Sequence, residues 1–215
     1  ITRKLHTKGY RVALMSRSGA SENLAKKCGG LGLRGSVTEV ADLERLVSMT
    51  LEAYGRIDAV VNHTAHPPKG ELLEIPDADW LSGFNMRIMN VVRMTRLVTP
   101  VMQEQGGGAW GNISTFAAFE PELALPVSCT LRAGLSAFSK LYADRYAVDH
   151  IRMNNLLPGF IDSLPHSVKT VNRVPMARIG TTREIADTTA FLLSDGAGYI
   201  TGQSLIVDGG VTRHI

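Results

Sequence analysis

The sequence has few cysteines and no long apolar runs, and both scarcities narrow the class of protein. Among 215 residues there are two cysteines, Cys28 and Cys129, whose spacing fits neither a disulfide framework nor a metal site. A cytoplasmic location is the expectation, since reducing compartments keep cysteines free. Apolar runs are short and broken by polar residues, and residues 1–15 contain no continuous apolar segment. We therefore predict neither a membrane span nor a secretory signal before the domain.

An excess of charge of either sign is also missing. The 23 Lys and Arg residues nearly balance the 20 Asp and Glu residues, and the basic residues are scattered along the chain. This distribution gives no support for a nucleic-acid partner or a membrane surface. Hydrophobic residues make up 44% and charged residues 20%, which is typical of one globular domain spanning residues 1–215. His63, His66 and Asp162 lack the pattern of a metal site, so no metal is predicted.

Strand-like and helix-like segments alternate along the chain. Strands are predicted at residues 10–15, 31–35, 57–61, 109–114, 151–157 and 203–207. Helices are predicted at residues 1–8, 21–27, 39–54, 77–105, 128–146 and 182–194. The segment 57–61 is apolar on both faces, which predicts a central parallel strand. The alternation predicts an α/β fold, a doubly wound parallel sheet with helices on both faces.

The ends and connections of these elements are predicted from individual residues. Asp77 is expected to cap the helix that follows it, and either Thr181 or Thr182 to cap the last helix. Residues 160–181 are expected to form a long irregular connection. In a doubly wound sheet, ligands bind beyond the carboxyl ends of the strands. The expected site is therefore built from residues 16–17, 62–68, 114–119, 158–163 and the first turn of the helix at Ser128.

Four short motifs occur in an order that identifies a family resemblance. They are Gly55-Arg56-Ile57-Asp58, Asn112-Ile113-Ser114-Thr115, Ile151-Arg152-Met153-Asn154 leading to Pro158-Gly159, and the closing residues 202–210. Together they make the chain similar to the short-chain dehydrogenase/reductase family, and within it to the branch that includes 3-oxoacyl-acyl-carrier-protein reductases. The resemblance covers the whole chain. It implies a single Rossmann-like domain, a nicotinamide cofactor, a small carbonyl or alcohol substrate, and homodimers or homotetramers formed through the helices at 77–105 and 128–148.

The family places its first strand and its glycine-rich phosphate loop before the region where this sequence begins. Glycines in that loop let backbone amides approach the pyrophosphate at a helix N-terminus. No such loop follows Ile1, so we expect the strand and the loop to precede it.

The resemblance also implies which residues contact the cofactor. Ser16 and Arg17 stand where NAD-preferring relatives have an Asp that binds the ribose, so NADP is predicted over NAD. The alternative for Arg17 is a solvated surface side chain. The remaining cofactor candidates, matched by motif, are Ser36, Val37, Asn62, His63, Thr64, Arg132, Pro158, Gly159 and Ile161.

The catalytic group departs from the family pattern at four positions. The Tyr position holds Ser128, and the Lys position one helical turn later holds Arg132. The Ser position falls on Thr115, with Ser114 beside it, and the Asn position falls on Arg87. A serine hydroxyl is a poor acid compared with a phenol, and a guanidinium keeps its proton. Binding is expected to survive these exchanges, whereas the usual proton transfer is in doubt.

Three functions remain open at this point. The first is an oxidoreductase with a divergent catalytic group, in which His63 or His66 could replace the missing acid because imidazole titrates near neutrality. The second is a non-catalytic homologue that binds a dinucleotide or another anion through Arg87 and Arg132. The third is a lyase or an enzyme similar to the halohydrin dehalogenases, which have this fold and an Arg in the Lys position.

Overall fold

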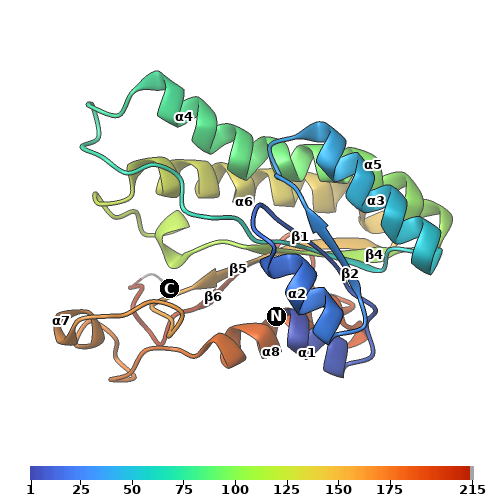
Figure 1. The fold of residues 1–215 in the computed structure, drawn as a ribbon. Helices are drawn as coiled ribbons and strands as arrows, with labels where there is room; N and C mark the ends of the chain where they lie inside the picture. Colours follow the sequence, from blue (N-terminus) through green and yellow to red (C-terminus); the bar gives the residue numbers. More distant parts are fainter. Residues whose placement is uncertain (214–215) are drawn as a thin grey trace.

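The computed structural model describes residues 1–213, and strands and helices alternate through them (Figure 1). The strands are β1 (Ala13–Ser16), β2 (Leu31–Arg34), β3 (Ala59–Asn62), β4 (Gly108–Ile113), β5 (Ile151–Pro158) and β6 (Ser204–Val207). The α-helices are α1 (Thr2–Thr7), α2 (Ala20–Lys27), α3 (Val40–Tyr54), α4 (Asp77–Phe84), α5 (Asn90–Glu104), α6 (Pro126–Tyr146), α7 (Val168–Val171) and α8 (Thr182–Leu193).

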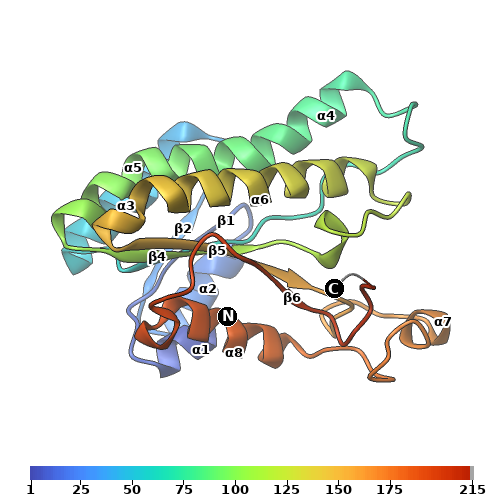
Figure 2. The ribbon, with the colours of Figure 1, turned by 180° about the vertical axis from the view of Figure 1, so that it is seen from behind.

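The strands lie parallel between two layers of helices, which confirms the predicted α/β class. Helices α3, α4, α5 and α6 lie on one side of the strands, and α1, α2 and α8 lie on the other (Figures 1 and 2). The four-stranded sheet has the order β3-β4-β5-β6, and a separate two-stranded sheet pairs β1 with β2. Every pairing between these strands is parallel.

The two sheets do not join, and this corrects the prediction that residues 57–61 form a central strand. In the part of the chain that the structure describes, β3 pairs only with β4, and β1 pairs only with β2. The facing edges of β1 and β3 both border one large cavity. As a result, all four residues of β3 are only partly buried, although their side chains are apolar enough for a central strand.

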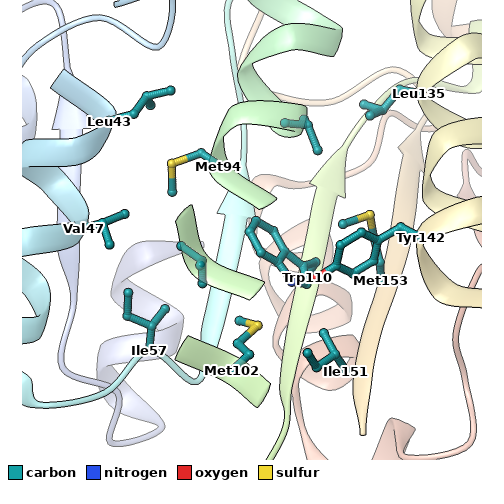
Figure 3. Close-up of a cluster of buried hydrophobic side chains, with 12 residues drawn as sticks. Leu43, Val47, Ile57, Met94, Met102, Trp110, Leu135, Tyr142, Ile151 and Met153 are labelled. Atoms are coloured by element: carbon teal, nitrogen blue, oxygen red, sulfur yellow. The ribbon is translucent and has the colours of Figure 1, made fainter. Parts of the chain in front are cut away.

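The main hydrophobic core lies between the sheet and helices α3, α5 and α6 (Figure 3). Trp110 on β4 packs edge-on against Tyr142 on α6, with the ring centroids 6.0 Å apart. The hydroxyls of Tyr142 and Thr99 are 2.6 Å apart, so the buried phenol keeps a hydrogen-bond partner. Tyr142 therefore has a packing role, and it lies far along α6 from Ser128.

A row of polar side chains crosses the four-stranded sheet and lies inside this core. Asn62, Asn112, Asn155 and Ser204 occupy matching positions on β3, β4, β5 and β6. Asn62 donates to Asn112 over 2.8 Å, Asn112 donates to Asn155 over 3.0 Å, and Asn155 donates to Ser204 over 3.2 Å. Ser139 on α6 joins the row from the helix side, where Asn112 also donates to it. Buried amides need such partners, so this row specifies the strand register.

The helix predicted over residues 77–105 is interrupted. A π-helical turn, Asn85–Met89, separates α4 from α5. The π-turn inserts an extra residue into one helical turn, a feature that often occurs at functional sites. The prediction for the start of this helix is also wrong in detail, because Pro76 occupies the N-cap and Asp77 begins the first turn without a side-chain cap bond.

Two differences concern the last third of the chain. The connection predicted as irregular over residues 160–181 contains the short helix α7. Thr181, and not Thr182, caps α8, and it forms a reciprocal capping box with Glu184.

Candidate functional site

A cavity of about 2040 Å³ extends from the gap between β1 and β3 to the carboxyl ends of β3, β4 and β5. Eight of the cofactor candidates from the sequence lie on its wall: Val37, Asn62, His63, Thr64, Arg132, Pro158, Gly159 and Ile161. Two further catalytic candidates, Ser114 and Thr115, line it as well. Residues far apart in the sequence thus meet at the edge of the sheet where the alternating pattern predicts a ligand.

The other candidates do not line this cavity. Ser128 is 3% exposed and Arg87 is 3% exposed, so both lie in the protein behind the wall. Ser16, Arg17 and Ser36 lie outside it, near the carboxyl ends of β1 and β2.

Arg132 connects the helix α6 to the end of strand β4. Its Nε donates to Ser128 Oγ over 3.0 Å, and its Nη1 donates to the Ile113 carbonyl over 3.0 Å. The side chain is nearly buried, yet it forms part of the cavity wall. Two of the three guanidinium nitrogens therefore hold the side chain in place, and Nη2 has no hydrogen bond among the described residues. Burial lowers the pKa of Arg132 to about 10, so it stays charged at pH 7.

Ser114 and Thr115 follow β4 directly and are held by the backbone. The Ser114 amide donates to the Leu156 carbonyl on β5 over 2.8 Å. Ser114 Oγ is buried and has no hydrogen-bond partner among the described residues. The Thr115 hydroxyl accepts from the Ala117 amide over 3.4 Å and caps a short 3₁₀ turn. An unpaired hydroxyl on a cavity wall is free to bind a ligand oxygen.

Arg87 lies in the π-helical turn and points into the protein. One of its Nη atoms donates to the Ala65 carbonyl, and its Nε is buried without a partner. Burial, and then the charge of Arg132, lower the pKa of Arg87 to about 9, so both guanidiniums carry charge at pH 7.

The close approach of α4 to α6 depends on Gly83, because a Cβ there would lie 2.7 Å from a methyl carbon of Val127.

His63 and His66 follow β3 beside the two arginines. Each is exposed, and both line the open cavity. The surrounding protein still lowers the pKa of His63, first through desolvation and then through the charges of Arg87 and Arg132. The pKa of His66 is lowered by desolvation and by the same two charges. Both imidazoles are therefore mainly neutral at pH 7 and able to accept a proton.

The residues at the ends of β1 and β2 differ in whether their side chains already form hydrogen bonds within the protein. The Ser16 hydroxyl donates to the Ser18 carbonyl over 2.6 Å and accepts from the Ser21 amide over 3.1 Å, so it stabilises its own turn. Arg17 is exposed, and only its backbone carbonyl is engaged, by Arg34 Nε over 3.3 Å. The Ser36 hydroxyl lies 2.7 Å from the Thr38 hydroxyl. Arg17 is thus the available cation at this end of the site.

The sequence patterns did not predict the residues that surround the cavity mouth. Glu122, which follows β4, lines the cavity and forms an ion pair with Arg173 from the 160–181 connection. Arg173 also stacks over the Phe160 ring, 5.0 Å from its centroid. No local motif marks this contact, since its partners are separated by about fifty residues. Gly159 packs against the Asp208 backbone, and a Cβ there would lie only 2.7 Å from Asp208 Cα.

Residues 1–213 contain neither a candidate metal-binding cluster nor a helix that could span a membrane. No group of three or more His, Cys, Asp and Glu side chains within residues 1–213 could hold a metal ion. In the same range, no helix is long and apolar enough to cross a membrane.

Comparison with known proteins agrees with the fold. The family described as enoyl-(acyl carrier protein) reductase matches residues 1–212. The chain is 30% identical over 183 residues to the 3-oxoacyl-[acyl-carrier-protein] reductase of Thermotoga maritima, covering 82% of this chain and 74% of that protein. It is 30% identical over 231 residues to dehydrogenase/reductase SDR family member 4 of Oryctolagus cuniculus, covering 100% and 89%. It is also 30% identical over 190 residues to the 7alpha-hydroxysteroid dehydrogenase of Bacteroides fragilis, covering 83% and 73%.

The chain belongs to the short-chain dehydrogenase/reductase family. That family is one of oxidoreductases that use a nicotinamide dinucleotide and act on small molecules. The residues present fit such a cofactor, since eight of the cofactor candidates, among them Asn62, Thr64 and Pro158, line one cavity.

Proposed function

We propose that this protein is an NADP-dependent oxidoreductase acting on a carbonyl or alcohol compound, with a catalytic group that differs from the family pattern. The main support is that Ser114, Thr115 and Arg132 share one cavity wall with the cofactor candidates Asn62 and Pro158. A substrate oxygen placed there would meet hydroxyl donors and a guanidinium together. These groups can bind and polarise a carbonyl without a phenol.

The nicotinamide cofactor would supply or accept the hydride. Asn62, Thr64 and Pro158 would hold it, because they line the cavity along the ends of β3 and β5. Thr115 would orient the reacting substrate oxygen, and the nearby charge of Arg132 would stabilise negative charge on that oxygen.

The proton of the substrate hydroxyl must be transferred by a group other than Ser128 or Arg132. Ser128 is buried and its oxygen accepts from Arg132, and a guanidinium does not release its proton near pH 7. His63 lines the same cavity, and its lowered pKa keeps the imidazole neutral at pH 7. We therefore propose His63 as the proton acceptor in alcohol oxidation, with solvent reached through the open cavity.

The preference for NADP rests on Arg17. This side chain is exposed beside the end of β1, with Arg34 next to it, and the two cations can bind a 2′-phosphate. The experiment is to titrate purified protein with NADPH and NADH, and then to follow NADPH oxidation with a panel of carbonyl compounds. Turnover with NADPH supports the proposal, and failure to bind either dinucleotide contradicts it.

A second candidate is a non-catalytic homologue that binds the dinucleotide only. The observation that favours it is the hydrogen bond from Arg132 to Ser128, which occupies the two positions where the family has its proton-transfer pair. Measurable NADPH binding, together with no turnover in either direction across the panel, would favour this candidate over the oxidoreductase.

Assembly and location complete the proposal. We propose a homodimer or homotetramer formed through α5 and α6, where Leu141 is 70% exposed on the outer surface. Cys28 and Cys129 are both free, which supports a reducing cytoplasmic location. Light scattering of the purified protein tests the assembly.

A further inference from the structure

We propose that Arg132 and Ser114 form an anion subsite, and that the substrate carries a carboxylate which binds there. This inference rests on the proposed function for the identity of the ligand as substrate, but the subsite itself can be tested by binding alone. Two observations support it. The cavity wall has hydrogen-bond donors without partners, and the positive charge beside it has no counter-ion among the described residues.

The two unpaired donors are brought to the same part of the wall by the contact of Arg132 with Ile113. Arg132 Nη1 binds the Ile113 carbonyl, and Ser114 is the next residue. Arg132 Nη2 has no hydrogen bond in the part of the chain that the structure describes. Ser114 is 7% exposed, and its buried Oγ has no partner there either. A ligand oxygen at this point on the wall can accept from both groups.

The local charge is positive and lacks a protein counter-ion. Arg87 and Arg132 are both nearly buried, and no carboxylate within residues 1–213 forms a salt bridge with either of them. Glu122 lines the cavity, but it forms its ion pair with Arg173. A buried charge is costly when it is left without a counter-charge, so two buried cations favour an anion beside them.

The π-helical turn places the second charge. Arg87 is the middle residue of Asn85–Met89, and its side chain reaches back to the Ala65 carbonyl. Arg87 does not line the cavity, so it is not expected to touch the ligand. It acts as a positioning residue that holds the 62–66 segment and adds to the positive potential at Arg132.

The geometry favours a carboxylate over a larger anion. Nε and Nη1 of Arg132 are already engaged, so the guanidinium cannot form a two-pronged contact with a phosphate through them. Three of the five guanidinium N–H groups remain, one on Nη1 and two on Nη2, together with the Ser114 hydroxyl. Nη2 and the hydroxyl can each donate to one of the two oxygens of a carboxylate.

The first experiment measures binding of benzoate and of its neutral analogue benzamide to the whole protein by calorimetry. We expect benzoate to bind about tenfold more tightly or better, since a charge-assisted hydrogen bond is stronger than a neutral one. Arg132→Gln should remove this preference. Arg145→Lys, on the exposed far end of the same helix, should keep it. Equal binding of both probes, binding of neither, or a preference that survives in Arg132→Gln would overturn the proposal.

One further variant and one further probe complete this binding experiment. Arg132→Lys retains a charge, and it should keep part of the preference for benzoate if Arg132→Gln proves unstable. Inorganic phosphate is the competing probe, and tighter binding of phosphate than of benzoate would overturn the assignment to a carboxylate.

The second experiment separates this inference from the proposed function. NADPH oxidation is compared for phenylglyoxylate and its methyl ester, which differ in one charge. A KM at least about tenfold lower for the acid supports the inference. Turnover of the ester with an equal or lower KM overturns the inference and leaves the oxidoreductase intact. No turnover of any carbonyl, with a benzoate preference that depends on Arg132, contradicts the oxidoreductase and leaves the subsite intact.

Discussion

Arg132 Nε donates a 3.0 Å hydrogen bond to Ser128 Oγ, one turn earlier on α6. Motif matching predicts that these two residues stand at the Tyr and Lys positions of the family, and the long guanidinium reaches the hydroxyl that the short serine provides. The pair is nearly buried and is joined to β4 through the Ile113 carbonyl. It is a rigid donor site, whereas the family pattern at these positions is a proton-transfer pair.

The first prediction tests whether only the proton donor differs. The double variant Ser128→Tyr with Arg132→Lys restores the family pattern, and we expect kcat for carbonyl reduction to rise about 100-fold or more, as a general acid typically contributes. Steady-state kinetics with NADPH provide the measurement. Ser128→Phe with Arg132→Lys has the same ring without the hydroxyl, and it should show no rise. An unchanged rate in the tyrosine variant would mean that the site performs another reaction.

The second prediction concerns pH and stability. The folded pKa of His63 is lowered from its ordinary value of about 6.5. Well above about pH 6.5, the imidazole is neutral in both states and contributes no pH dependence. As the pH falls below that value, the unfolded chain takes up a proton before the folded chain does, so folding stability falls. His63→Gln should therefore show a smaller loss of Tm between pH 7 and pH 5 than the unchanged protein.

The control for this measurement is His6→Gln, which removes an exposed histidine from α1. In the oxidation direction, activity should rise with pH through the lowered pKa of His63 and then level off near neutrality. The same pH–rate profile in His63→Gln would show that another group accepts the proton.

The third prediction concerns the polar row across the sheet. Asn112 exchanges hydrogen bonds with Asn62, Asn155 and Ser139, and it is fully buried. Asn112→Ala removes all three of these hydrogen bonds, and each contributes about 0.5–1.5 kcal/mol. We expect the free energy of unfolding to fall by about 2–4 kcal/mol, measured by urea denaturation. Asn23→Ala on the exposed side of α2 should change it by less than about 0.5 kcal/mol.

The fourth prediction tests the cofactor preference. Arg17→Gln removes the exposed cation beside β1, and we expect the Kd for NADPH to rise about tenfold or more while the Kd for NADH is unchanged. Lys26→Gln removes a nearby exposed cation on α2 and serves as the control. Parallel weakening of both dinucleotides in Arg17→Gln would contradict a contact with the 2′-phosphate.

The sequence predicts the elements well because apolar spacing is a local property. The strand at 151–157 and the helix at 182–194 were predicted to within about two residues, since each has a clear period and clear end signals. The π-helical turn at Asn85–Met89 was not predicted, because one extra residue in a turn leaves no periodic signal.

Which strands pair and which side chains lie close together depend on the whole folded chain, so both were harder to predict. The composition of β3 suits a central strand, but its position at a sheet edge depends on which strands lie beside it. Arg87 and Arg132 were each identified by motif, yet their electrostatic interaction and the missing counter-ion follow from how α4 packs on α6. The Glu122–Arg173 ion pair has no sequence signal at all.

The open edges of β1 and β3 have a consequence for solution behaviour. Backbone amides on these edges lack strand partners among residues 1–213, so they should exchange with deuterium orders of magnitude faster than those of β4 and β5. Edges of this kind are also templates for pairing with other chains. The exchange rates of the β1 and β3 amides therefore report directly on whether anything occupies the space between these strands. The tendency of dilute samples to aggregate is a second measure of the same property.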